Sequence, residues 1–136
     1  MGESTTHARL VEELVLWLGR EVSKTPGAAI YADTPSTRRG EKPPAIGAYT
    51  PDVFCRTLGG SCVFIGEAKT ADDIEPRHTR EQLLTFLMYL RDHGSGTLVI
   101  AVPWHAVNQA KWLIRALQNA TATASVQTVY LQKLPG

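Results

Sequence analysis

The sequence has little of several features that mark specialised classes of protein. Two cysteines, Cys55 and Cys62, are too few for a disulfide framework or a four-cysteine zinc site. No apolar run approaches the about 20 residues that a membrane-spanning helix needs. The first residues lack the basic segment followed by an apolar one that a secretory signal requires. We therefore expect a cytoplasmic protein without a membrane segment.

The chain also has almost no excess of charge of either sign. The 14 basic and 13 acidic residues leave a formal net charge of +1 and a pI near 7.8. Nucleic-acid-binding domains often have a pI above about 9. Any contact with nucleic acid is thus expected to depend on local basic clusters, which occur at residues 37–42 and 77–80. The length of 136 residues favours one domain, spanning 1–136.

Apolar periodicity predicts three helices and five strands. The helical spacing occurs in residues 6–24, 75–93 and 105–120, and strand-like runs occupy residues 28–33, 52–57, 62–69, 97–103 and 125–133. The order α-β-β-β-α-β-α-β predicts an α/β fold in which helices flank both faces of a central mixed sheet. Residues 34–50 are rich in proline and glycine and form a long loop, a kind of segment that is commonly functional or partly disordered.

The stretch YTPDVFCRTLGGSCVFIGEAKT, residues 49–70, predicts a strand hairpin with charged residues at its open end. If Gly59 and Gly60 form the turn, Asp52 lies opposite Glu67, and Lys69 points to the same side as Glu67. A bulge would shift this register by one residue. Opposed like charges destabilise a strand pair by a few tenths to about 1 kcal/mol. Lys69 can neutralise part of that repulsion, and a divalent cation could bind both carboxylates.

A salt-bridge cluster at the end of a sheet is the structural alternative for these three residues. Burial disfavours it, because removing an ion cluster from water seldom stabilises a protein. Pro51-Asp52 and Glu67-Ala68-Lys69 resemble the motif of the PD-(D/E)XK nuclease superfamily. The predicted order of elements is also similar to the restriction-endonuclease-like core of that family.

The resemblance implies an endonuclease that depends on Mg²⁺ or Mn²⁺ and hydrolyses DNA. By analogy with the family, the metal ligands would be the carboxylates of Asp52 and Glu67 and the backbone carbonyl of Ala68. Lys69 would orient the attacking water and stabilise negative charge. Catalysis of this kind needs a cation at the scissile phosphate, since the phosphodiester charge repels a nucleophile.

The family also suggests residues outside the hairpin. Many members add an acid from the first helix, for which Glu13 is preferred here over Glu12, although both also fit solvated flanking acids. Some members have a glutamine on the helix after the lysine strand, and Gln82 occupies that place, with helix capping as its alternative role. Phosphate contacts are expected from basic residues, for which solvated charge is the alternative: Arg38, Arg39, Lys42, Arg77, His78 and Arg80.

Three functions remain open at this level. The first is a structure-specific DNA endonuclease that resembles Holliday-junction resolvases and acts as a homodimer, so that its two-fold symmetry matches that of the substrate. The second is a nuclease of restriction or phage type that acts on duplex or flap DNA. The third is a domain with the nuclease fold that binds nucleic acid or a protein without cutting. A chance match in an unrelated α/β protein would remove all three.

Overall fold

The computed structural model describes residues 5–33, 42–60, 62–74 and 76–135. Its helices and strands are α1 (Thr5–Glu21), β1 (Ala29–Ala32), β2 (Val53–Arg56), β3 (Val63–Ala68), α2 (Arg77–His93), β4 (Gly96–Pro103), α3 (Val107–Thr121) and β5 (Gln127–Lys133). Three short 3-10 turns join them: η1 (Leu58–Gly60), η2 (Ala71–Asp73) and η3 (Trp104–Ala106). The predicted order of helices and strands is confirmed, and the predicted bounds differ by up to three residues.

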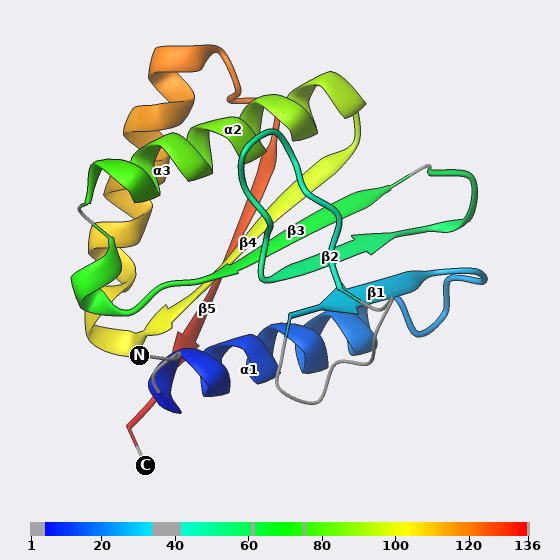
Figure 1. Ribbon diagram of the computed structural model, residues 1–136, viewed down its shortest axis with the longest axis horizontal. Helices are drawn as coiled ribbons and strands as arrows, with labels where there is room; N and C mark the ends of the chain where they lie inside the picture. Colours follow the sequence, from blue (N-terminus) through cyan, green and yellow to red (C-terminus); the bar gives the residue numbers. More distant parts are fainter. Residues whose placement is uncertain (1–4, 34–41, 61, 75, 136) are drawn as a thin grey trace.

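The five strands form one mixed sheet in the order β1-β2-β3-β4-β5 (Figure 1). β1, β2 and β3 are antiparallel neighbours, whereas β3, β4 and β5 run parallel. The parallel strands require crossover connections, and α2 and α3 supply them. The α/β class and the mixed sheet predicted from the sequence are therefore confirmed.

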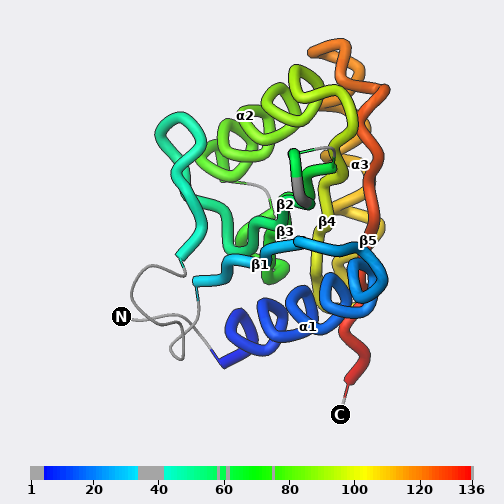
Figure 2. The backbone as a smooth tube through the Cα atoms, turned by 90° about the vertical axis from the view of Figure 1, so that its right-hand side faces the viewer, coloured from blue at the N-terminus to red at the C-terminus, as the bar shows by residue number. Residues whose placement is uncertain are grey.

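Helices cover both faces of this sheet, as predicted. α1 lies on one face, and α2 and α3 lie on the other (Figures 1 and 2). The alternation of side chains along the strands sorts the core into two clusters. Leu14 and Leu18 of α1 pack with Val53 and Val99, while Phe86 of α2 packs with a second set of strand residues that includes Phe54, Ile65, Leu98 and Ile100. Each face of the sheet is thus closed by its own apolar layer.

None of the described helices combines the length and the apolar character that crossing a bilayer requires.

The hairpin of β2 and β3 has the predicted register. Its paired residues are Val53 with Gly66, Phe54 with Ile65, Cys55 with Phe64 and Arg56 with Val63. The connection includes the 3-10 turn η1, in which both glycines adopt the predicted positive φ, 79° at Gly59 and 68° at Gly60. Beyond the strand ends, the N–H of Thr57 donates to the carbonyl of Cys62 at 3.1 Å. The pairing of β2 with β3 is therefore not interrupted by a bulge.

The described part of the long loop, residues 42–50, folds back beside α2 (Figures 1 and 2). Ile46 and Tyr49 exchange two backbone hydrogen bonds of 2.7 and 3.1 Å, which close a tight turn. Gly47 has a positive φ of 61° in that turn, and a Cβ there would lie 3.3 Å from Thr85 of α2. The ring of Tyr49 packs edge-on against Phe86 at 6.5 Å. These contacts hold the chain against α2 just before it enters Pro51 and Asp52.

Candidate active site

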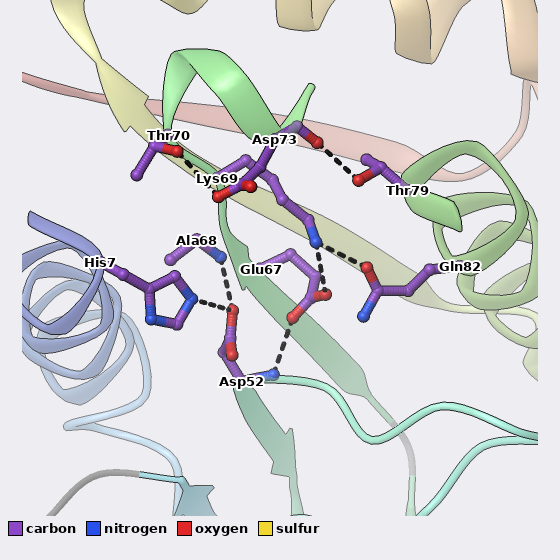
Figure 3. A network of polar contacts seen from close by, with 9 residues as sticks. All are labelled: His7, Asp52, Glu67, Ala68, Lys69, Thr70, Asp73, Thr79 and Gln82. Carbon is purple, nitrogen blue, oxygen red and sulfur yellow. Dashed lines mark hydrogen bonds and ion pairs between the residues drawn. The ribbon is translucent and has the colours of Figure 1, made fainter. Parts of the chain in front are cut away.

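The parallel strands end at one edge of the sheet, and the charged residues of the hairpin gather there. Asp52 precedes β2, Glu67 and Ala68 complete β3, and Lys69 follows it. Gln82 reaches this edge from α2 (Figure 3). In open α/β sheets, ligands commonly bind just outside the carboxyl ends of the parallel strands. The fold thus brings five of the predicted site residues to a place where such proteins bind ligands.

Asp52 and Glu67 are interlocked through each other's backbone. Val53 pairs with Gly66, and Asp52 and Glu67 are the next residues outward on the two strands, so they lie opposite each other. The N–H of Asp52 donates to Oε2 of Glu67 at 2.8 Å, and the N–H of Ala68 donates to Oδ2 of Asp52 at 2.9 Å (Figure 3). The two carboxylates are therefore held side by side in spite of their like charge.

Glu67 is buried with an incompletely bonded carboxylate. Its side chain is 1% exposed, and Oε1 accepts no hydrogen bond from the residues that the structure describes. The nearest cation is Nζ of Lys69, 3.8 Å from that oxygen, which is an ion-pair contact beyond hydrogen-bond length. Burial, and then the charge of Asp52, raise the pKa of Glu67 well above its ordinary value, while Lys69 opposes the shift. A buried carboxyl group with a raised pKa and an open oxygen is stabilised when a proton or a metal cation binds to it.

Asp52 has the opposite protonation behaviour although it is largely buried. Burial alone would raise its pKa, but hydrogen bonds from His7 and from the Ala68 N–H outweigh burial and lower the pKa below its ordinary value. Hydrogen bonds to the charged form of an acid stabilise that form. Asp52 is therefore ionised at neutral pH.

Lys69 is held between β3 and α2. Its Nζ donates to Oε1 of Gln82 at 2.6 Å, and its side chain is 13% exposed. The segment between them is braced at η2, where Thr70 donates to the Asp73 carboxylate at 2.7 Å and Thr79 donates to the Asp73 carbonyl at 2.5 Å (Figure 3). Gln82 thus contacts the lysine, and its side chain does not cap α2, whose N-cap position is occupied by Pro76.

His7 is a site residue that the sequence reasoning missed. Its Nε2 lies 3.3 Å from Oδ2 of Asp52. A signal for it existed, since His7 precedes Leu10, Val11 and Leu14 by three, four and seven residues and so continues the buried stripe of α1. The predicted motif does not include this position.

Glu13, the acid preferred from the first helix, does not join the site. It is exposed, and the described residues offer it no hydrogen bond or ion pair. Six residues separate it from His7, which places the two about 120° apart around the helix. The structure brings the histidine of α1 to Asp52, and not the glutamate.

The predicted phosphate-binding residues are scattered. Arg77 is 91% exposed and pairs with Glu81 at 3.1 Å, and the exposed Arg80 lies about 160° around α2 from Gln82. His78 packs edge-on against Tyr49 at 5.3 Å. Lys42 is exposed and 3.9 Å from Asp33.

Two further predicted phosphate contacts, Arg38 and Arg39, lie outside the described residues. Of the four that are described, only His78 shares the Gln82 side of α2, because it lies one turn earlier at a spacing of four residues.

The donor set at this edge is rich in oxygen. In the described part of the chain, no three or more His, Cys, Asp or Glu side chains are grouped so as to hold a metal ion. Two carboxylates are present, however, and the N–H and C=O of one strand residue leave the strand on the same side, so the Ala68 carbonyl faces the Asp52 side together with its N–H. Mg²⁺ commonly uses one or two protein carboxylates and completes its shell with water and phosphate oxygens.

Comparison with known proteins supplies no relative for this chain: no family model, curated protein or solved structure was found to match it. The resemblance to the PD-(D/E)XK superfamily therefore stays a prediction. It depends on Pro51-Asp52, on Glu67-Ala68-Lys69 and on the order of the elements.

Proposed function

We propose that the protein is a metal-dependent endonuclease that hydrolyses phosphodiester bonds of DNA. The observation that carries the proposal is Glu67: a buried carboxyl group, one oxygen of which accepts no hydrogen bond within the described part of the chain, beside an ionised Asp52 and a lysine. Two carboxyl groups held against each other in a poorly hydrated place are an arrangement that a protein seldom keeps for stability. A bound divalent cation would accept the open oxygen and favour the ionised form of Glu67.

The residues divide the work of hydrolysis between them. Asp52, Glu67 and the Ala68 carbonyl would hold the cation, which when bound supplies positive charge at the phosphate and makes a water molecule more acidic. Lys69 has three ammonium donors, of which Gln82 occupies one. Another is available to orient the attacking water or to contact a phosphate oxygen. The water oxygen bonds to phosphorus, the bond to one sugar oxygen breaks, and that oxygen leaves with a proton.

The restriction-endonuclease-like core is part of the same proposal. The order of elements and the antiparallel β1-β2-β3 sheet continued by parallel β4 and β5 support it. So does the location of the acids at the end of the central hairpin, where β2 begins and β3 ends. DNA as the substrate rests on the resemblance, and a cleavage assay distinguishes a junction, a flap and a plain duplex.

A cleavage assay with Mg²⁺ or Mn²⁺ on junction, flap, single-stranded and duplex DNA tests the proposal. We expect activity on at least one of these substrates, and its abolition by EDTA. Glu67→Gln keeps the shape of the side chain but removes its charge, and it should lower the rate by about 100-fold or more. Asp92→Asn is the matched control, because it removes an exposed carboxylate at the far end of α2.

The outcomes separate the alternatives. Equal rates for the wild type and for a triple Asp52→Ala, Glu67→Ala, Lys69→Ala variant would remove the site assignment. Binding of Mn²⁺ that depends on Asp52 and Glu67, without cleavage of any of the four substrates, would contradict the nuclease and favour a non-catalytic binding domain.

A further inference from the structure

We infer that His7 is a positioning residue of this site: from α1, it holds the Asp52 carboxylate in the orientation that binds the divalent cation. The inference rests on the proposed function. It adds a residue that lies on a different element and about 45 positions earlier in the sequence than the acid it serves.

The contact between His7 and Asp52 is an ion-pair contact that is largely shielded from water. Nε2 of His7 lies 3.3 Å from Oδ2 of Asp52, and each of the two side chains is only 17% exposed. A hydrogen bond to a carboxylate is stronger than one between neutral groups, and stronger again where water is largely excluded. The imidazole N–H is therefore an effective anchor for Asp52.

The bond is directed at one carboxylate oxygen. Oδ2 of Asp52 also accepts the N–H of Ala68 at 2.9 Å, so two donors from two different elements converge on it (Figure 3). This restricts rotation of the carboxylate, and Oδ1 is the oxygen that makes neither bond. Without the imidazole, the N–H of Ala68 would be the donor that remains on Oδ2.

Close packing of α1 on the sheet places His7 within reach. A Cβ at Gly66 would lie 3.2 Å from Leu14 Cδ2 and 3.2 Å from Val53 Cβ, which is tighter than most Cβ contacts, so glycine lets the helix lie this near to β3 without displacing either neighbour. Gly66 directly precedes Glu67 in β3. Gly66, next to Glu67, thus contributes to the close packing of α1 on the sheet that brings His7 to Asp52.

Calorimetric titration with Mn²⁺ tests the role of His7 without any need for cleavage. Partners that hydrogen-bond a metal ligand typically change metal affinity by about 10- to 100-fold when they are removed. We expect His7→Ala to weaken Mn²⁺ binding by about that factor. His7→Gln should restore part of the affinity, because its amide can donate to the same oxygen. Glu21→Ala, at the other end of α1, is the control that should bind like the wild type.

A second comparison separates positioning from packing. In an Asp52→Asn background, His7→Ala should weaken Mn²⁺ binding no further, because the group that His7 holds has lost its charge. Melting temperatures in EDTA report the metal-free fold. An unchanged dissociation constant in His7→Ala would overturn the inference and leave the nuclease proposal intact.

Two other results also decide the matter. Equal weakening in His7→Ala and His7→Gln, together with lower melting temperatures in EDTA for both, would show that His7 only packs α1 and would overturn the inference. A wild-type chain that binds no Mn²⁺ would remove the proposed function, and this inference with it.

Discussion

The strand pair β2–β3 is closed at both ends by bonds between a side chain and the backbone, but the two closures differ in charge. At the turn end, the Thr57 hydroxyl accepts the Cys62 N–H at 3.0 Å and donates to the Cys62 carbonyl at 3.4 Å. At the open end, the same kind of closure is made by Asp52 and Glu67, whose carboxylates accept backbone N–H groups at 2.9 and 2.8 Å.

The neutral closure shows that the charged one is more than the hairpin requires. A threonine suffices to satisfy the backbone at the turn end, with the hydroxyl used as both donor and acceptor. The open end instead has two acidic side chains in contact, and one oxygen of Glu67 accepts no hydrogen bond among the described residues. Such groups destabilise a fold and are typical of sites that bind something. The comparison therefore predicts opposite responses at the two ends.

The largest expected effect is stabilisation by the metal, at the open end only. Mn²⁺ at about 100 times its dissociation constant should stabilise the wild-type chain by about 2.7 kcal/mol, because it binds the folded form alone. Glu67→Gln should lose that gain, and Thr57→Val should keep it. Urea unfolding with and without Mn²⁺ measures all three. Equal stabilisation of the Glu67→Gln variant would contradict the assignment of Glu67 as a ligand.

In the absence of metal, we expect Glu67→Gln to be more stable than the wild type at neutral pH. The amide relieves the repulsion by Asp52 and the desolvation of a buried charge, and its oxygen still accepts the Asp52 N–H. A gain of about 1 to 2 kcal/mol is typical when a functional site is neutralised. Urea unfolding in EDTA measures it, with Asp92→Asn as the control for the loss of an exposed charge.

The size of that gain should depend on pH in a defined direction. Because the pKa of Glu67 is raised above 4.5 in the fold, the stability that it contributes is fully present below 4.5 and is lost as the pH rises through the raised value. The advantage of Glu67→Gln therefore vanishes in acid and grows as the pH rises. Asp52, with its lowered pKa, contributes stability that is lost in acid, but it is common to both proteins. A gain that shrinks between about pH 5 and pH 8 would contradict this sign.

The smallest effect is expected at the turn end. Thr57→Val should lower the free energy of unfolding by about 1 kcal/mol, because it leaves the Cys62 N–H without the hydroxyl. The backbone bond from the Thr57 N–H to the Cys62 carbonyl remains and limits the loss. Urea unfolding measures it, and unchanged cleavage by this variant would separate stability from function. A loss of activity as large as that of Glu67→Gln would erase the contrast between the ends.

Much of this hairpin was predictable because its determinants are local. The two glycines permit the positive φ of the turn, and strand alternation then carries the register outward to Asp52 and Glu67. The same alternation directs Lys69 to the α2 side, where it contacts Gln82. These predictions needed only the period of a strand and the position of a turn.

Other placements depended on how distant elements pack. Glu13 lies at the margin of the apolar stripe of α1 and is exposed in the docked helix. Arg77 is expected by sequence to contact phosphate, and in the fold it pairs with Glu81, four residues later on α2. The turn of residues 46–49 was hidden inside a proline-rich segment, since it depends on packing against α2.

The sequence by itself determined the α/β class, the order of the elements and the opposition of Asp52 to Glu67, because side-chain periodicity and turn chemistry act over a few residues. Only the tertiary structure decided that His7 contacts Asp52, that Gln82 binds Lys69 and that one buried oxygen of Glu67 has no hydrogen bond from the described residues. Those three facts depend on the distance and rotation of two helices against a sheet. Both follow from close packing across the whole core, to which residues far apart in the chain contribute together.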